Sequence, residues 1–244
     1  MSVQFEPIRA EPAYRKVAAA LRERILDRTL RDGDRLPAET ELARQFGVHR
    51  STVREALREL QTGGLLSRRP GSKRLAITRP TTAIVAAGVS HALALHDVTY
   101  FDVWEALMIL EPQIAECAAR RRTRKQLLHI AAAEERFATD HADTASAVHH
   151  AAAFFRAIAE AARNHVLVLA QEPLLQLLES SLVRMIDRVP QARDRIAAAQ
   201  RRIRQALDAA DPEEARAWMS RHIRDFRRGY ELAGLARTHL LSRS

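Results

Sequence analysis

Residues 49–54 combine hydroxyl groups with two arginines at a spacing that suits contact with base pairs. The segment reads HRSTVR, and Arg50 and Arg54 stand four residues apart, so a helix would carry both on one face. Arginine can donate two hydrogen bonds to guanine O6 and N7, which discriminates between bases by about 1–3 kcal/mol per contact. The hydroxyl groups of Ser51 and Thr52 suit contacts with phosphates or bases. The pattern is therefore typical of a helix that reads duplex DNA.

Two short helices joined by a tight turn are needed to present these side chains. A helix is predicted to begin around Pro37, which suits the first helical position, and to end at Gly47. The acidic Glu39 in its first turn complements the positive end of the helix dipole. A second helix follows the turn and stops at Gly63-Gly64. The apolar residues of the two helices can then share one small core: Leu42, Phe46, Val53, Leu57 and Leu60.

An amphipathic helix over residues 14–28 and a two-stranded hairpin complete this predicted unit. Residues 65–69 and 74–78 form short extended runs around Pro70-Gly71-Ser72, a turn-forming triplet. Basic side chains flank the turn, where they could neutralise phosphates or enter the minor groove: Arg68, Arg69, Lys73 and Arg74. Arginines on an isolated helix are usually solvated surface charges, but the preceding helix and the basic hairpin favour contact with DNA. Residues 1–80 are therefore predicted to form a winged helix-turn-helix domain.

The net charge of +9 is concentrated at the N-terminal end of the 244-residue chain. Residues 1–80 hold 17 lysines and arginines against 10 acidic residues, whereas residues 81–244 hold 22 against 20. Such a basic domain attracts polyanions, although acidic lipid headgroups would attract it as well. The single cysteine, Cys117, allows no intramolecular disulfide, and no apolar run approaches the roughly 20 residues that span a membrane. We expect a cytoplasmic protein without membrane association or an export signal.

The remainder of the chain has the composition of an all-helical domain. Gly88 is the only glycine between residue 81 and Gly229, and alanine, leucine and arginine are abundant. Helix starts are predicted at three residues whose side chains can cap a helix: Thr123, Asn164 and Asp211. Six or seven helices result.

The predicted organisation is mainly α, with three parts. A DNA-binding domain over residues 1–80 is followed by a linker helix over 81–96 and an all-helical bundle over 97–240, which would bind an effector and form the dimer. Residues 81–244 contain no phosphate loop, nucleophile elbow, paired-carboxylate site or metal quartet. We therefore expect a protein that is not an enzyme and that has no cofactor.

The DNA-reading segment resembles the signature of the GntR family of bacterial transcription regulators. The matching residues are Leu36 to Glu39, Leu42-Ala43, Phe46 to Val48, Arg50, Thr52 to Leu57, Leu60 and Gly64-Leu65. The resemblance implies a homodimer whose recognition helices and wings read a short palindromic operator. The expected DNA-binding residues are Thr40, His49, Arg50, Ser51, Thr52, Arg54, Gly71 and, beside the wing turn, Lys73.

Three departures from the family pattern lie within this segment. The family usually has arginine where Thr40 stands and serine or threonine where His49 stands. The wing also lacks the family's second glycine, because Ser72-Lys73-Arg74 follows Gly71. These differences predict that this protein prefers a different operator sequence from other members of the family.

Residues 97–235 resemble the helical effector domain, of the FCD type, found in the FadR branch of that family. The matching positions include Glu111-Pro112, Ile114-Ala115, Phe154, Ile158, Asn164, Ile203, Asp211, Met219 and His222. Many members of the branch hold a divalent metal between one aspartate and three histidines, and the metal receives the carboxylate of the effector. Those four positions are occupied here by Ala151, Phe155, Gln200 and His222, and Leu107 replaces a common arginine. One imidazole does not make a zinc or nickel site.

We therefore expect a metal-free effector pocket that suits a hydrophobic or acyl carboxylate, lined by Leu107, Ala151, Phe155, Gln200 and His222. A metal-dependent sensor of a small carboxylate is the alternative, and it would have to recruit His149 or His150. A constitutive DNA-binding protein without an effector is a third interpretation. His222 could equally be a structural histidine. The function expected first is a ligand-responsive regulator, with repression that the ligand relieves.

Overall fold

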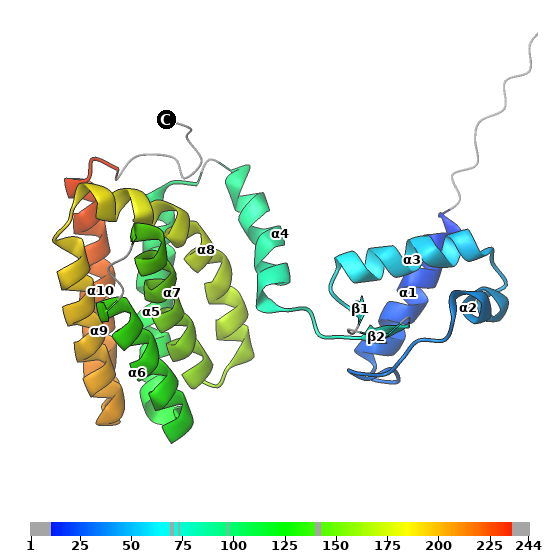
Figure 1. Cartoon of the computed structure of the whole chain (residues 1–244), viewed down its shortest axis with the longest axis horizontal. Helices are drawn as coiled ribbons and strands as arrows, with labels where there is room; N and C mark the ends of the chain where they lie inside the picture. Colours follow the sequence, from blue (N-terminus) through cyan, green and yellow to red (C-terminus); the bar gives the residue numbers. More distant parts are fainter. Residues whose placement is uncertain (1–10, 69–70, 73, 97, 140–142, 236–244) are drawn as a thin grey trace, which may run out of the picture. The chain divides into compact units, whose positions relative to one another are not determined.

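Two separate hydrophobic cores divide the chain into two compact units, residues 1–84 and 85–244. The computed structural model describes residues 11–68, 71–72, 74–96, 98–139 and 143–235. Helices dominate both units, and one short hairpin lies in the first (Figure 1). The predicted mainly helical fold, with an N-terminal winged helix-turn-helix and a C-terminal helical bundle, is confirmed. The boundary between the units falls inside helix α4 (Thr82–Ala94), within the stretch predicted as a linker helix.

Three helices of the first unit enclose its core: α1 (Ala13–Leu26), α2 (Glu39–Phe46) and α3 (Arg50–Thr62). The predicted apolar set lines this core, with Leu42, Val53, Leu57 and Leu60 buried and Phe46 packed against them. Gly47 between α2 and α3 has a φ of 64°, a value that glycine adopts without the strain a Cβ would bring. The tight turn therefore brings the start of α3 next to the start of α2.

Helix α2 begins at Glu39, so the prediction that Pro37 occupies the first helical position is wrong. The backbone N–H of Leu36 donates to the carbonyl of Leu75 in the hairpin, at 2.9 Å. This bond holds the chain extended before the helix, and Ala38 is still extended, with a ψ of 150°. The helix starts only after the segment that is tied to the hairpin.

The wing consists of β1 (Leu66–Arg68) and β2 (Leu75–Ile77), which pair antiparallel with Leu66 opposite Ile77. Both of these apolar side chains are buried against the helices, which fixes the register of the hairpin. Gly71 lies in the connecting turn with a φ of 76°. Three residues of the predicted wing lie outside the described residues: Arg69, Pro70 and Lys73.

The described part of the chain after residue 81 contains α4 and six further helices, in agreement with the six or seven predicted. They are α5 (Tyr100–Arg121), α6 (Arg124–Thr139), α7 (Thr144–Ala161), α8 (His165–Arg188), α9 (Ala192–Asp208) and α10 (Pro212–Leu232). Helix α5 packs against α7, α8, α9 and α10, so it forms the centre of the bundle (Figure 1). Side chains from all six helices meet in one core.

The three predicted helix starts are confirmed by capping hydrogen bonds. Thr123 and Gln126 form the expected reciprocal pair at the start of α6, with N–H to side-chain distances of 2.9 and 3.3 Å. The side chains of Asn164 and Asp211 each accept a backbone N–H from the first turn of their helix, at 3.0 Å. These local signals determine where α6, α8 and α10 begin.

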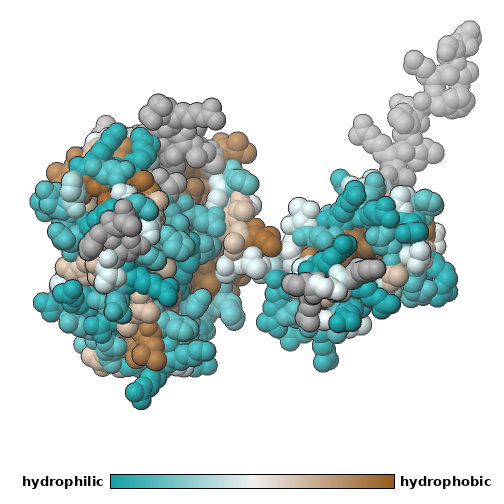
Figure 2. Space-filling view, in the orientation of Figure 1, coloured by the Kyte–Doolittle hydropathy of each residue, from teal (hydrophilic) through white to brown (hydrophobic). Residues whose placement is uncertain are grey.

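The visible face of both units is largely hydrophilic, with separate hydrophobic patches (Figure 2). Most large apolar side chains of the described residues are gathered in the two cores. Among the described helices, none by itself is both long and apolar enough to cross a membrane. The bent pair His165–Glu179 and Ser181–Arg188 meets that test by length and composition only.

Candidate nucleic-acid interface and buried polar residues

His49 caps the helix that carries the predicted reading residues. Its Nδ1 accepts the backbone N–H of Ser51 at 3.3 Å and lies 2.8 Å from the hydroxyl of the same residue. The imidazole of His49 therefore caps the helix. It replaces the side-chain oxygen of the serine or threonine that is usual at this position. Because Nδ1 accepts, the neutral ring carries its proton on Nε2, which remains a donor for a phosphate or a base.

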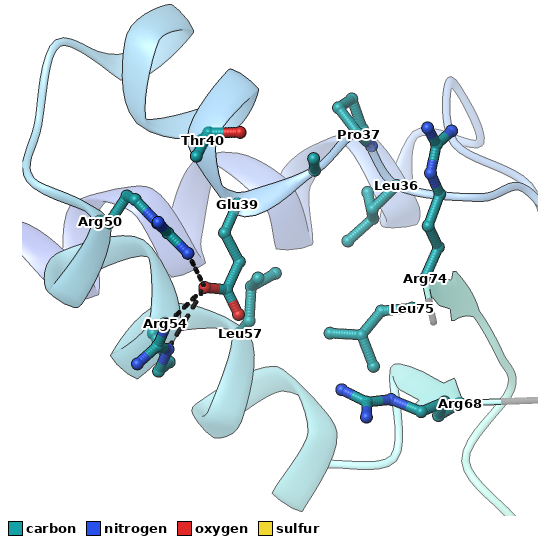
Figure 3. A pocket seen from close by; sticks show the side chains of 11 residues that line it. Leu36, Pro37, Glu39, Thr40, Arg50, Arg54, Leu57, Arg68, Arg74 and Leu75 are labelled. Carbon is teal, nitrogen blue, oxygen red and sulfur yellow. Dashed lines mark hydrogen bonds and ion pairs between the residues drawn. The ribbon is translucent and has the colours of Figure 1, made fainter. Parts of the chain in front are cut away.

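Arg50 and Arg54 lie on one exposed face of α3 and share a carboxylate partner. Arg54 Nε and Nη2 donate to Glu39 Oε2 at 3.2 and 3.0 Å, and Arg50 Nη2 lies 3.7 Å from the same oxygen (Figure 3). Half of each arginine side chain is solvent-exposed, 55% for Arg50 and 50% for Arg54. The hydrogen bonds from Arg54, with the charge of Arg50 beside them, lower the pKa of the Glu39 carboxyl. The predicted reading surface is thus exposed and organised by an acidic residue of α2.

A hollow of about 470 Å³ lies between this cluster and the wing. Figure 3 shows Arg50, Arg54 and Glu39 on one side of the hollow and Arg68 and Arg74 on the other. Four arginines and one glutamate therefore line the same space. This excess of positive charge suits a phosphate-bearing partner.

The other predicted DNA-binding residues have defined places in the first unit. Thr40 is exposed in the first turn of α2 and lines the hollow. Ser51 is exposed and Thr52 is half-buried in the first turn of α3, whereas Gly71 is exposed in the wing turn. Lys73 lies outside the described residues. Glu39 was missed as a member of the site, because the sequence only indicated a favourable charge at a helix end.

The five residues predicted to line an effector pocket are all buried in the second unit: Leu107, Ala151, Phe155, Gln200 and His222. The rings of Phe155 and His222 stack with centroids 5.5 Å apart and planes 9° apart. Phe226 lies one turn further along α10, with its ring centroid 4.7 Å from that of His222. An aromatic cluster therefore joins α7 to α10.

Two of these buried side chains carry polar atoms that bond to none of the described residues. Both amide atoms of Gln200 and Nε2 of His222 have no hydrogen-bond partner. Leaving a buried donor or acceptor unpaired costs about 1–3 kcal/mol. Burial lowers the pKa of His222 to about 4, so the ring is neutral at pH 7. These unbonded polar atoms are the ones that a bound molecule could satisfy.

A buried carboxyl group that the predictions did not include lies in the same core. Gln171 Nε2 on α8 donates to both carboxyl oxygens of Glu111 on α5, at 2.9 and 3.0 Å, and to the backbone carbonyl of Phe155 at 3.3 Å. Burial raises the pKa of Glu111 to about 8, against the hydrogen bond from Gln171. Glu111 was noted as part of a family signature, but nothing local in the sequence indicates that it is buried.

The residues at the family's metal-binding positions do not fit a metal ion. Ala151 and Phe155 offer no donor atom, and Gln200 offers only an amide. In the described parts of the chain, no group of three or more His, Cys, Asp or Glu side chains could hold a metal ion.

A winged helix-turn-helix with a basic hollow, attached to a separate helical bundle, is the architecture of a DNA-binding regulator. The family described as bacterial regulatory proteins, gntR family, matches residues 13–73, and the FCD domain matches residues 102–225. The chain belongs to the gntR family and carries an FCD domain. The family resemblance seen in the sequence is confirmed at this level.

Individual relatives agree with this assignment. The Uxu operon regulator of Haemophilus influenzae is 34% identical over 67% of this chain, a match that spans 59% of that regulator, less than two thirds of its length. The Glc operon transcriptional activator of Escherichia coli is 26% identical over 94% of this chain and 93% of its own length. Among solved structures, the Streptococcus agalactiae GntR protein superimposes with a TM-score of 0.63, at 26% identity, over 88% of this chain and 99% of that one.

Proposed function

We propose that this regulator is a ligand-responsive repressor of the FadR branch that acts in the cytoplasm. In this proposal a homodimer binds a short palindromic operator, and an effector in the FCD domain relieves repression. The observation that carries the DNA-binding half is the exposed N-terminal part of α3, where Arg50 and Arg54 face a hollow that two arginines of the wing also line. A helix of this kind reads bases from the major groove.

The proposed DNA contacts fall into two groups. Arg50 and Arg54 read base edges, whereas the hydroxyl and imidazole groups of the neighbouring turns contact phosphates or bases. The complete set is Thr40, His49, Arg50, Ser51, Thr52, Arg54, Gly71 and Lys73, of which the last lies outside the described residues. The DNA-binding domain is taken as residues 1–80, the linker helix as 81–96 and the effector and dimer domain as 97–240.

The proposed effector is a hydrophobic or acyl carboxylate that binds without metal. Gln200 Nε2 and the protonated Nε2 of a neutral His222 would supply two uncharged donors for a carboxylate oxygen. The apolar part of the ligand would pack against Leu107, Ala151 and Phe155, which are buried and carry no polar side-chain group. This arrangement would satisfy polar atoms that are otherwise unbonded in the core.

Regulation requires the effector to discriminate between two arrangements of the dimer. Only a ligand that binds one separation of the two DNA-binding domains more tightly than the other can change operator affinity. Because the Glc operon relative is by name an activator, the direction of regulation needs its own test. Repression predicts that deleting the gene raises transcription from the operator-bearing promoter.

Two alternatives have different support. A metal-dependent sensor would need His149 or His150, whose rings lie 5.7 Å apart on α7. His149 is exposed to solvent, however, while the predicted pocket residues are buried. A constitutive DNA-binding protein has no effector, so the buried polar atoms of Gln200 and His222 would gain no hydrogen-bond partner from a ligand.

Replacing either reading arginine tests the DNA-binding proposal. A duplex selected from a random-sequence library by the unaltered protein serves as the operator, and its affinity is compared with that of an unselected duplex of equal length. Arg50→Ala and Arg54→Ala should each lower operator affinity by about 1–3 kcal/mol, with the melting temperature unchanged. Arg24→Ala, which removes an exposed arginine from α1, is the matched control and should retain operator affinity. Unaltered affinity and specificity in both the Arg50 and Arg54 variants would show that α3 is not the helix that reads DNA.

A further inference from the structure

We propose that Glu39 is a positioning residue that fixes the two reading arginines and thereby sets sequence specificity at the expense of general affinity for DNA. The inference rests on the proposed role of Arg50 and Arg54 as base-reading residues. Glu39 would not touch a base itself. It would act through the two guanidinium groups that share its carboxylate.

The geometry of the cluster supports a positioning role. One oxygen, Glu39 Oε2, accepts two hydrogen bonds from Arg54, at 3.2 and 3.0 Å, and lies 3.7 Å from Arg50 Nη2. The carboxylate belongs to α2 and the arginines belong to α3, so the contact joins the two helices of the motif. Arginine has five N–H donors, and the two that Arg54 gives to Glu39 leave three for a base. Both guanidinium groups are therefore held before DNA arrives, which lowers the conformational entropy lost on binding.

The charge of Glu39 distinguishes this role from simple attraction to DNA. A carboxylate that faces the hollow repels phosphates and cancels part of the positive charge of four arginines. The negative charge of Glu39 therefore weakens binding to every DNA sequence by a similar amount. Its benefit must lie in the orientation of the arginines, which matters only for the sequence that they match.

Glu41 provides a matched control in the same turn of α2. Its carboxylate accepts hydrogen bonds from Arg44 at 2.7 and 3.0 Å and from Gln45 at 2.7 Å, all within α2. Replacing Glu41 by glutamine removes the same charge two residues away without releasing either reading arginine. A purely electrostatic effect would therefore appear in both variants.

The experiment compares Glu39→Gln, Glu39→Asp and Glu41→Gln in the full-length protein at fixed salt. Each variant is titrated with the library-selected duplex and with an unselected duplex, and the ratio of the two affinities gives the discrimination. Loss of one negative charge should raise affinity for the unselected duplex roughly twofold to fivefold in both glutamine variants. Discrimination should fall roughly tenfold in Glu39→Gln and remain unchanged in Glu41→Gln. Glu39→Asp keeps the charge but shortens the reach, so it should lose discrimination without gaining general affinity.

Equal discrimination in Glu39→Gln and Glu41→Gln would overturn the inference. A parallel loss of both affinities in Glu39→Gln and Glu39→Asp would also overturn it, because the carboxylate would then support the fold rather than orient side chains. The alanine variants of Arg50 and Arg54 separate this failure from failure of the proposed function. If those variants lose the selected duplex and Glu39→Gln does not, only the role of Glu39 is wrong.

Discussion

Glu111 lies fully buried on α5. Its carboxyl group accepts hydrogen bonds from the amide of Gln171 and forms no ion pair with a cation among the described residues. Burial raises its pKa from an ordinary value of 4.5 to about 8, so the folded protein keeps the proton when the unfolded chain has lost it. Between these two values the folded state binds more protons than the unfolded state. Its contribution to stability is therefore present below pH 4.5 and decreases as the pH rises toward 8.

We expect the free energy of unfolding to fall by about 1–2 kcal/mol between pH 6.5 and 8, since one linked proton contributes about 1.4 kcal/mol per pH unit. The opposite contribution of His222, whose pKa is lowered from 6.5 to about 4, is largely complete at pH 6.5 and cancels only a minor part of this fall. Urea unfolding at several pH values measures the change. Glu111→Gln retains an acceptor for Gln171 but cannot ionise, so its stability should be flatter over the same range. An identical pH dependence in the two proteins would show that Glu111 is not responsible.

At the scale of the element, two adjacent glycines with different conformations follow α3. Gly63 has a φ of −75°, which any residue adopts, and a Cβ there would meet backbone oxygens at 3.6 and 3.8 Å. Gly64 has a φ of +72°, and a Cβ there would lie 3.0 Å from Ile84 Cδ1 and 3.2 Å from Pro80 Cα. Only the second glycine is required for the turn from α3 into the wing.

Replacing each glycine by alanine should therefore give effects of opposite sign. Gly63→Ala should stabilise the protein by about 0.4–1 kcal/mol, because alanine has less freedom to lose on folding. Gly64→Ala should destabilise it by about 1–3 kcal/mol, since the backbone would be strained and the Cβ crowded. Denaturant unfolding of the two full-length variants measures both changes. A stable Gly64→Ala protein with unaltered DNA binding would contradict this account of the turn.

At the scale of the whole molecule, the proposed effector site in the FCD domain predicts that ligand binding changes global stability. A ligand that binds only the folded state stabilises it by about 2.7 kcal/mol at a concentration one hundred times its Kd. Straight-chain fatty acids and acyl-CoAs should therefore raise the melting temperature by several degrees, and sugar acids should have little effect. The shift should persist in the presence of EDTA.

Gln200→Leu offers a sharp variant for the same measurement. It removes two unpaired buried amide atoms, so it should raise the melting temperature of the unliganded protein and abolish most of the shift caused by the ligand. Sensitivity of the shift to EDTA, or stoichiometric metal in the purified protein, would favour the metal-dependent sensor. No stabilisation by any of these compounds would favour the constitutive DNA-binding protein.

Local patterns in the sequence were sufficient for the elements and for the family. Apolar spacing, capping residues and turn-forming residues act over three to eight positions, so they predicted the winged helix-turn-helix and the starts of α6, α8 and α10. Such local patterns could not predict that α2 begins after Pro37. The hydrogen bond from Leu36 to Leu75, which keeps the chain extended there, joins residues far apart in the sequence. The exposure of Arg50 and Arg54 also followed from their position on a helical face.

The sequence by itself determined the helical fold, the segment predicted to read DNA and the loss of the family's metal ligands at three of four aligned positions, since these depend on residue type and short-range spacing. Only the tertiary structure decided which groups meet. Glu39 reaches Arg54 across 15 residues, and Gln171 reaches Glu111 across 60. Charge pairing, burial and the resulting pKa values depend on neighbours that folding brings together, and for that reason they are not written in any local stretch of the chain.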